Sequence, residues 1–381
     1  MKLLKRLLLF VIILIVVYNI WAATGRVKNT DGIKITSLTK EPITSVGIDS
    51  GRGNVIGLQP LLNAASYSSK ESLLQSLLPY FSLAKEKRIL NDKTIVVLPE
   101  YTGSWLVAAN EKKSVYREAY IMDAMQTMVI SNIFKFVWTY FTAPASSNKS
   151  TYAVFAMKGK EMAEIYQDVF STLAKEFNVT IVAGSIVLPE PSINKEGKLT
   201  AGKGSLYNTS AIFDNKGNLV SPLVKKIYPV DEEAGFTACG IETQKPVFNT
   251  PAGNLGVLVC ADSWYPAAYQ SFNEDIKIIA VPSLGGTDDI WNAPWNGYNG
   301  FKAPGDVDTM DYKKLTEGEA WEKYSMGPRS VKAGVHYGMN VFFTGQLWDK
   351  KSEGRVLVLN KDSLTVYPPA TFGRIVNLWL N

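Results

Sequence analysis

Short apolar runs and helix-spaced apolar positions alternate along the chain from residue 53 onward. Runs typical of buried strands occupy residues 54–59, 94–100, 179–184, 256–260, 276–281 and 340–344. Residues 71–88 and 161–178 carry apolar side chains at helical spacing instead. Two hairpins are predicted, 207–220 across the turn 214–217 and 356–367 across 360–362. Strands interleaved with helices and hairpins predict one mixed α/β sandwich over residues 53–381.

Two inserts interrupt this pattern, at about residues 102–150 and 285–325. Within the first, residues 124–141 are strongly apolar and aromatic with the single charge of Lys135. Gln126, Ser131 and Asn132 make this segment too polar for a membrane span, so it predicts either an interfacial helix or lid, or a helix packed on the core. The second insert is rich in Trp, Asn, Gly and Pro over residues 291–321 and predicts a long loop that borders a functional site.

The amino terminus has the pattern of a membrane anchor. Residues 1–6 are basic, and residues 7–23 carry no charge, a run at the short end of the about 17–25 residues that span a bilayer. A cleaved signal peptide is the alternative, but cleavage after Ala23 would place Trp21 where a small residue is preferred. Tyr18 and Trp21 suit the headgroup level of a retained anchor. We therefore expect an anchor over 1–23, an irregular linker over 24–52, and a domain outside the cytoplasm because the positive charges precede the span.

Composition excludes several other classes of protein. The 381 residues are 46% hydrophobic and 20% charged, which is ordinary for a folded domain. The net charge of +5 is mild and no basic stripe with interleaved aromatics is present, so we expect no nucleic-acid partner. Two cysteines cannot form a disulfide scaffold. A bridge between Cys239 and Cys260 would also silence the better-placed thiol.

Three residue types in the chain could together carry acyl chemistry. Cys260 ends an apolar strand, where α/β sheets place ligand-handling groups. Acyl transfer through a thiol needs a proton acceptor and positive charge for the oxyanion. Glu100 ends another apolar strand, where burial would raise its pKa, and Lys225 and Lys226 offer an ammonium group. Each alone is more often a structural or solvated residue. The one histidine, His336, is a rival base, but no acid stands near it in sequence.

The order of these segments adds a second argument. The chain shows, in sequence, Leu98-Pro-Glu100, then Lys225-Lys226-Ile-Tyr-Pro229, then Gly256-Val-Leu-Val-Cys260-Ala-Asp262. This order resembles the nitrilase (carbon–nitrogen hydrolase) superfamily over roughly residues 54–367. The resemblance implies an α-β-β-α sandwich with two mixed sheets, here preceded by one N-terminal transmembrane helix. It also implies that members pair through a face of the sandwich, so a homodimer is expected.

The resemblance also implies roles for individual residues. Glu100, Lys226 and Cys260 would form the catalytic triad, since Lys226-Ile-Tyr-Pro229 fits the aliphatic-amidase form better than Lys225 does. An auxiliary glutamate would be Glu233, or Glu232, after a one-residue slip that leaves Ala234 in the expected place. No metal or organic cofactor is implied.

Residues beside these motifs are the expected contacts of the substrate. The backbone N–H of Ala261 would join Lys226 in holding the oxyanion. Substrate-binding side chains are expected at Tyr101, Trp264, Tyr265 and Ser283.

Together these observations predict a membrane-anchored amide hydrolase that works through a cysteine acyl-enzyme on a small amide or a lipid-linked substrate. The alternative is an N-acyltransferase that moves an acyl chain to or from a lipid-linked or lipoprotein amine. A tethered binding scaffold without turnover is a third reading, which the joint presence of Glu, Lys and Cys disfavours.

Overall fold

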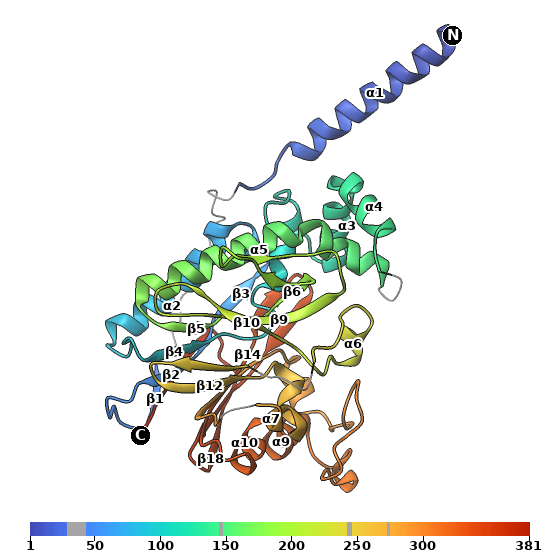
Figure 1. Cartoon of the computed structure of the whole chain (residues 1–381). Coiled ribbons are helices and arrows are strands. Elements are labelled where there is room, and N and C mark those ends of the chain that lie inside the picture. The colour runs from blue at the N-terminus through green and yellow to red at the C-terminus, as the bar shows by residue number, and fades with distance from the viewer. Residues whose placement is uncertain (29–42, 145–147, 242–245, 273–274) are drawn as a thin grey trace.

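Four layers, helix–sheet–sheet–helix, make up the body of the protein (Figure 1). The computed structural model describes residues 1–28, 43–144, 148–241, 246–272 and 275–381. The helices α2 (Lys70–Glu86) and α5 (Lys149–Phe177) cover one sheet, and α7 (Pro266–Gln270), α9 (Glu317–Tyr324) and α10 (Met326–Lys332) cover the other. The predicted mixed α/β sandwich is confirmed.

The first sheet has the strand order β1-β19-β2-β4-β5-β9-β10, with β6 paired to β9. Pairing is parallel for β1 with β19 and along β2, β4 and β5, and antiparallel elsewhere. Its strands are β1 (Thr44–Val46), β2 (Asn54–Gln59), β4 (Thr94–Val97), β5 (Thr180–Val182), β6 (Ile186–Pro189), β9 (Leu206–Phe213), β10 (Leu219–Lys225) and β19 (Arg374–Trp379).

The second sheet has the order β11-β12-β13-β14-β17-β18, with a parallel centre from β12 to β14 and antiparallel edges. Its strands are β11 (Val247–Thr250), β12 (Gly253–Val257), β13 (Ile278–Ser283), β14 (Tyr337–Phe342), β17 (Val356–Asn360) and β18 (Ser363–Tyr367). Two small sheets complete the fold, namely β3 (Leu61–Asn63) with β15 (Thr344–Leu347) and β16 (Lys350–Glu353), and β7 (Ser192–Ile193) with β8 (Leu199–Thr200).

The remaining helices lie at the chain ends, in the inserts and beside the site. They are α1 (Lys2–Ala23), α3 (Ile121–Ser131), α4 (Ile133–Phe141), α6 (Asp231–Ala234) and α8 (Asp288–Trp291), with the 3₁₀ turns η1 (Ala64–Tyr67), η2 (Ser104–Ala108), η3 (Val115–Arg117), η4 (Cys260–Trp264) and η5 (Thr309–Asp311). The helix α5 begins 12 residues before the predicted 161–178 because its buried face extends from Tyr152 to Phe177. Asn148 caps its first turn, and Asn178, at φ +52°, ends it in the left-handed region.

Other segments also differ from the sequence-based expectation. Residues 29–42 of the predicted linker lie outside the described residues, and Thr44–Val46 forms strand β1 beside β19. Part of the predicted 291–321 loop is helical, because Thr316 and Glu319 cap α9 and its Trp321 is buried.

The 124–141 segment forms two helices that meet at Asn132. The helix α3 buries Ala124, Met128 and Ser131, whereas none of the nine described residues of α4 is buried. Polar contacts stabilise the break between the two helices: Asn132 donates to the Glu111 carboxylate and accepts a hydrogen bond from Arg26. The expectation of a helix packed on the core is therefore confirmed for α3, whereas α4 is only partly covered, and an interfacial or lid role for it stays a prediction.

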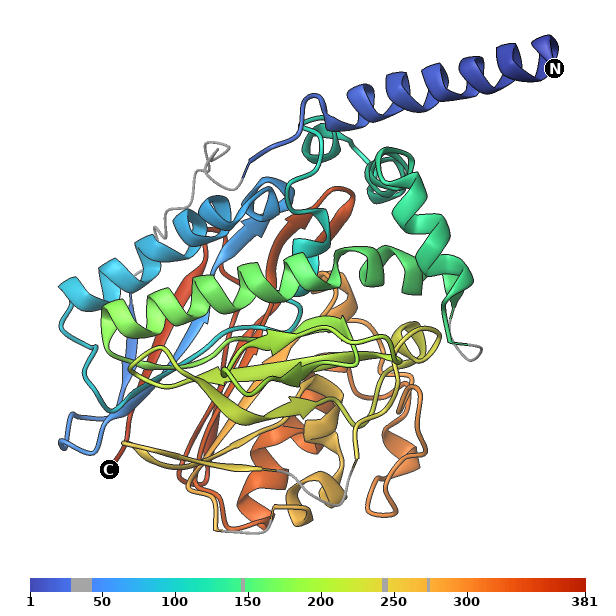
Figure 2. The ribbon, with the colours of Figure 1, turned by 45° about the horizontal axis from the view of Figure 1, so that its top comes forward.

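One helix among the described residues, α1, is long and apolar enough to cross a membrane. Its carboxyl end lies beside the first insert in both ribbon views (Figures 1 and 2). The Tyr18 hydroxyl donates to Ile130 O at 2.9 Å and accepts from Ile133 N at 3.1 Å. The Lys112 ammonium donates to the carbonyls of Trp21 and Thr24. The carboxyl end of the apolar helix α1 is thus held by hydrogen bonds to the body of the protein.

Candidate active site

Glu100 stands three residues after the end of β4 and is 2% exposed. Its backbone N–H donates to Ser283 O at 3.2 Å, which ties it to the end of β13 in the facing sheet. Its Oε2 accepts from the Leu284 N–H at 3.0 Å, and Oε1 accepts from Lys226 Nζ at 2.9 Å. The carboxylate therefore sits between the two sheets with both oxygens engaged.

Lys226 follows directly after β10 and is also 2% exposed. Its ammonium pairs with Glu100 and with Glu233, which lies in the short helix α6 and is 4% exposed. The carboxylate of Glu233 also accepts the Tyr101 hydroxyl at 2.5 Å. A buried lysine between two buried carboxylates results, and such charges are tolerated inside a protein only when paired.

Asn208, in β9, bridges the two carboxylates. Its Nδ2 donates to Glu100 Oε1 and to Glu233 Oε1, both at 2.8 Å, and its backbone carbonyl accepts from Lys226 N at 2.8 Å. Its Oδ1 is buried, with no hydrogen-bond partner among the described residues. Sequence reasoning missed this residue, because Thr209 and Ser210 follow it in β9 and a further polar side chain there does not stand out.

Cys260 opens the 3₁₀ turn η4 after β12 and is 6% exposed. Its φ of +50° lies in the left-handed region, which non-glycine residues occupy at a cost of about 1–3 kcal/mol. Its thiol contacts the Leu284 carbonyl at 3.7 Å, beside the Leu284 N–H that holds Glu100. The turn thus holds the sulfur against the segment that orients the carboxylate.

Asp262 holds this turn in place. Its Oδ1 accepts from the N–H groups of Ile227 and Tyr228, each at 2.9 Å, and its Oδ2 accepts from Val259 N at 3.4 Å. Because Ile227 and Tyr228 follow Lys226 directly, Asp262 links the cysteine turn to the lysine segment. Asp262 belongs to the cysteine motif of the sequence, but its role becomes apparent only from these contacts.

The pKa values of the clustered groups reflect two opposing effects: burial, which disfavours the charged form of each group, and pairing with an opposite charge, which favours it. Burial raises the pKa of Glu100, and the Lys226 ammonium and a hydrogen bond from the Cys260 thiol only partly oppose it. Burial alone would lower the pKa of Lys226, but Glu100, Cys260 and Glu233 outweigh it and raise that pKa well above its usual value. The pKa of Glu233 is lowered, because Lys226 and its hydrogen bonds outweigh burial.

Cys260 itself is held as a thiol. Burial and the Glu100 charge raise its pKa far above the usual range, against the opposing effect of Lys226. A resting thiol that donates toward a carboxylate of raised pKa is the arrangement in which the proton passes to that carboxylate during attack on a substrate.

The other predicted site residues lie in three places. Ala261, Trp264 and Tyr265 line a small cavity of about 80 Å³ together with aromatic residues of the second insert. There the Trp264 and Trp321 rings meet edge to face at 4.8 Å. Tyr101 faces the opposite side, toward the first insert. Ser283 is fully buried, and it is its backbone carbonyl that meets the site, through Glu100.

The structure separates the predicted Glu233 and Lys226 from their neighbours in sequence. Glu233 joins the cluster, whereas Glu232 is exposed and accepts a weak bond from Asn299. Lys225 lies over the Tyr207 ring, 3.9 Å from its centroid, and outside the cluster.

Two alternatives for the thiol can also be placed. His336 is exposed and faces Asp362, away from the buried thiol. Cys239 is exposed, Cys260 is buried, and both are free thiols. Across the described parts of the chain, no group of three or more His, Cys, Asp or Glu side chains is arranged to hold a metal ion.

These features define a buried Glu–Lys–Cys site between two sheets, and comparison with known proteins places it in a family. Residues 55–296 match the carbon-nitrogen hydrolase family, and the chain belongs to that family. The nitrilase of Bacillus sp. (strain OxB-1) is 35% identical over 82 residues, 21% of this chain and 24% of the nitrilase. The Bacillus subtilis (strain 168) protein named "Probable hydrolase YhcX" is 26% identical over 123 residues, 32% of this chain and 21% of its own. The matches thus span about a quarter or less of these relatives.

Solved structures extend the likeness to most of the chain. The amidase from Nesterenkonia sp. AN1, in a mutant form with acrylamide added at its active-site cysteine, has a TM-score of 0.51 and 13% identity, covering 86% of this chain and 93% of the amidase. A cysteine-to-serine mutant of the same amidase has a TM-score of 0.52 and 13% identity, covering 87% and 92%. At this identity the likeness establishes the fold. The fold is that of nitrilase-superfamily amidases, with a long apolar helix in front.

Proposed function

We propose that the protein hydrolyses an amide carbon–nitrogen bond through a thioester formed on Cys260. The observation that carries this proposal is the buried cluster in which Glu100, Lys226 and Glu233 meet beside the Cys260 turn. Membership in the carbon-nitrogen hydrolase family supports the reaction class.

In the first step, Glu100 accepts the thiol proton while the Cys260 sulfur attacks the amide carbonyl carbon. The oxygen becomes an oxyanion, which the Lys226 ammonium and the Ala261 N–H stabilise. Removing one such donor typically costs about 10²–10³ in rate. Glu100 then returns the proton to the nitrogen, the carbon–nitrogen bond breaks, and the amine leaves.

In the second step, Glu100 takes a proton from water, which attacks the thioester carbon. The carbon–sulfur bond breaks, the proton returns to the sulfur, and a carboxylic acid leaves. Glu233 and Asn208 act as positioning residues, because they hold Lys226 and Glu100 without reaching the sulfur. Every bond made or broken is accounted for by one amide and one water.

The test uses purified full-length protein, a simple amide and ammonia release. Cys260→Ala should abolish activity, and Glu100→Gln should lower kcat by about 10²–10⁴-fold, the range of general acid–base catalysis. Glu233→Gln should also lower kcat, whereas the matched Glu232→Gln should stay within twofold of the wild type. Full activity in Glu100→Gln would rule out the proposed base.

Acyl transfer to a lipid-linked amine is a second candidate, favoured by the apolar helix α1 and the exposed apolar side chains of α4. Here an amine takes the place of water in the second step. Incubation with a long-chain amide as the acyl donor and a diacylated lipopeptide as the amine separates the two candidates. A mass gain of one acyl chain on the lipopeptide supports transfer, and release of the free carboxylic acid without that gain supports hydrolysis.

We also propose that α1 is a retained anchor and that the catalytic domain lies outside the cytoplasm. The basic residues before the apolar run support this orientation. The exposed thiol of Cys239 provides the test, because Cys260 is buried. A membrane-impermeant maleimide should label wild-type protein but not Cys239→Ser in right-side-out vesicles. Labelling only after the vesicles are opened would reverse the orientation.

A further inference from the structure

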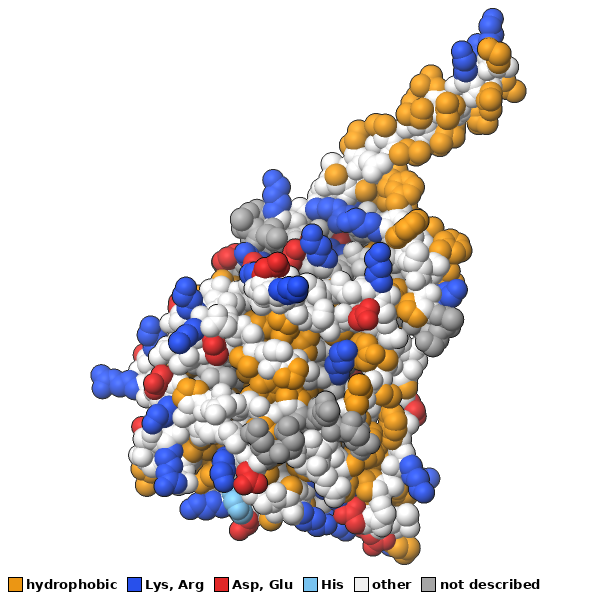
Figure 3. Space-filling view, viewed as in Figure 1, with side chains coloured by type: hydrophobic (Ala, Val, Ile, Leu, Met, Phe, Trp, Pro, Cys, Tyr) orange, Lys and Arg blue, Asp and Glu red, His pale blue; other side chains and the backbone are white. Residues whose placement is uncertain are grey.

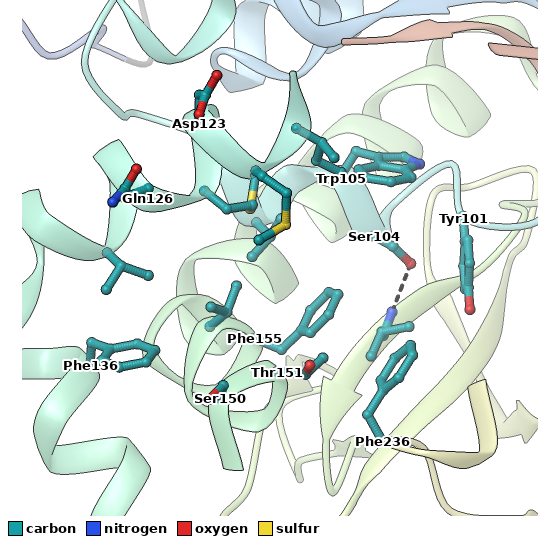
Figure 4. Close-up of a pocket in the computed structure, with 17 residues that line it drawn as sticks. Tyr101, Ser104, Trp105, Asp123, Gln126, Phe136, Ser150, Thr151, Phe155 and Phe236 are labelled. Atoms are coloured by element: carbon teal, nitrogen blue, oxygen red, sulfur yellow. Dashed lines mark hydrogen bonds between the residues drawn. The ribbon is translucent and has the colours of Figure 1, made fainter. Parts of the chain in front are cut away.

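A cavity of about 660 Å³ lies beneath the first insert, between the helices α3 and α4 on one side and α5 on the other (Figure 4). Its volume is within the about 300–1,000 Å³ of small-molecule sites. Deep in the cavity the wall is apolar, with Val107 and Val187 buried and Phe155 beside them. Asp123 and Gln126, both exposed, belong to its rim. Among the described residues that line it there is no lysine or arginine.

The inner end of the cavity is one side chain away from the catalytic cluster. The Tyr101 ring lines the cavity, while its hydroxyl donates to Glu233 at 2.5 Å. Tyr101 directly follows Glu100 and has a φ of +62°. Phe236 lines the same end, stacked on Phe155 at 6.1 Å, and its N–H bonds to the Glu233 carbonyl. Tyr101 and Phe236 stand together on the side of the cavity away from Gln126 (Figure 4).

The outer end reaches an apolar surface. Met122 lines the cavity and is 73% exposed, so the cavity opens beside it. The helix α4, which follows the other end of α3, exposes Phe134, Val137, Trp138 and Phe141. Such a set of large apolar side chains on one short helix marks a membrane or partner surface.

The same surface adjoins α1. Tyr18 of α1 meets the Phe134 ring edge to face at 5.2 Å and bonds to the backbone on both sides of the α3–α4 junction. In the space-filling view, apolar side chains cover α1 and appear again along the neighbouring α3–α4 edge (Figure 3). With α1 in a bilayer, these contacts bring the α3–α4 junction and Phe134 of α4 to the surface of that bilayer.

We infer that this cavity binds the acyl chain of a long-chain amide drawn from the membrane, with the amide carbonyl directed past Tyr101 to Cys260. The inference rests on the proposed function and names its substrate class. An unbranched chain suits this cavity because Ser104 and Tyr101 at its inner end are already hydrogen-bonded, to Val187 and Glu233, while Trp105 Nε1 has no partner among the described residues. A peptide or sugar would leave its own polar groups unpaired against that wall. The bilayer beside the α3–α4 junction supplies the chain.

The first experiment measures kcat/KM for acetamide, butyramide, decanamide and hexadecanamide with full-length protein in phosphatidylcholine nanodiscs. Each methylene moved from water into an apolar site raises kcat/KM by up to about fourfold, so the six additional methylenes of decanamide set a ceiling of about 4,000-fold over butyramide. We expect a preference of at least about 100-fold, well within this ceiling. Val129→Trp and Val154→Trp, which fill the cavity, should lower kcat/KM for decanamide by at least about tenfold. Acetamide hydrolysis should remain within about twofold, which shows that these variants fold.

Val137→Trp is the matched control, because Val137 lies on exposed α4 and is not among the residues that line the cavity. It should leave both substrates unchanged. Hydrolysis of all four amides at similar kcat/KM would overturn the acyl-chain site and leave the proposed function standing. Loss of decanamide selectivity in Val137→Trp alone would overturn it as well.

A binding measurement keeps the inference testable if no amide is turned over. Trp105 lines the cavity, so 9,10-dibromostearamide bound to Cys260→Ala should quench its fluorescence. The quenching should be smaller in the double variant that carries both Cys260→Ala and Trp105→Phe. The difference between the two proteins separates quenching inside the cavity from quenching by bromines dissolved in the bilayer. Equal quenching in both proteins would overturn the site, whatever the outcome of catalysis.

Discussion

Replacing Lys226 with methionine tests the charge arrangement of the site most directly. Lys226 is 2% exposed and pairs with Glu100 and Glu233, themselves 2% and 4% exposed. Methionine fills a similar volume without charge, so two buried carboxylates face each other unpaired. At least one must then be protonated in the folded protein. A carboxyl with an ordinary pKa of about 4.3 pays about 1.4 kcal/mol for each pH unit above that value, hence about 5 kcal/mol at pH 8 and about 2 kcal/mol at pH 5.5.

The direction in which the stability difference changes with pH follows from the carboxyl pKa values in wild type and in Lys226→Met. In wild type the pKa of Glu233 is lowered, so its contribution to stability is present above its unfolded pKa and is lost as the pH falls. In Lys226→Met the carboxyl pKa values are raised, so stability is gained as the pH falls through them. The gap between the two proteins therefore closes on acidification, from about 5 toward about 2 kcal/mol.

Urea unfolding of the detergent-solubilised full chain, followed by tryptophan fluorescence at pH 8 and pH 5.5, measures this gap. Lys160→Met is the matched control, because the Lys160 side chain is 89% exposed and 3.8 Å from Glu164. It should cost less than about 0.5 kcal/mol at either pH. A loss of unfolding free energy in Lys226→Met below about 1 kcal/mol at pH 8, or an equal loss at both pH values, would show that no buried carboxyl group has to be protonated when the lysine is removed.

Three further predictions concern the groups around this cluster. Asp262→Ala removes the acceptor of three backbone N–H groups and should cost about 3 kcal/mol in urea unfolding and at least tenfold in kcat, with Asp262→Asn milder in both. Burial raises the pKa of Glu317 to about 7, so its contribution to stability is lost as the pH rises through 7, and Glu317→Gln should flatten the fall in urea midpoint between pH 5.5 and 8.5. Tyr101→Phe keeps the ring but loses the bond that lowers the pKa of Glu233, and it should reduce kcat for acetamide without changing the preference for long chains.

The strands that sequence patterns detect are those with continuous apolar runs. Residues 94–97, 180–182 and 278–283 are buried throughout, and each lies within or overlaps a predicted run. The strand β19 escaped detection although it lies between β1 and β2 in the first sheet. It contains Asn377, which is buried and accepts from Asn54 at 2.6 Å. A polar residue satisfied by a partner 323 positions away gives no local strand signal.

Candidate catalytic residues were detectable for a related reason. Glu100 and Cys260 each follow an apolar run, and an abrupt polar residue there stands out. Glu233 could not be chosen over Glu232 because α6 is a single turn, and only the lysine it meets decides which face is buried. Asn208 remained undetected because its role depends on two carboxylates brought to it by the segment after β4 and by the helix α6.

The acyl-chain cavity depends on contacts that no local pattern contains. Its roof, α3 and α4, breaks at Asn132, and Glu111 holds that break while accepting from Arg26 and Lys158 at 2.9 and 3.0 Å. A buried carboxylate is stable only when cations pair with it, as Arg26 and Lys158 do here. Glu111 therefore links the end of α1, the α3–α4 junction and α5 in one network of salt bridges and hydrogen bonds. Because the buried Glu111 carboxylate connects all three, the apolar helix α1 and the roof of the cavity are held in a fixed position relative to each other. In the membrane-anchored arrangement that we propose, Glu111 therefore sets where the cavity meets the bilayer.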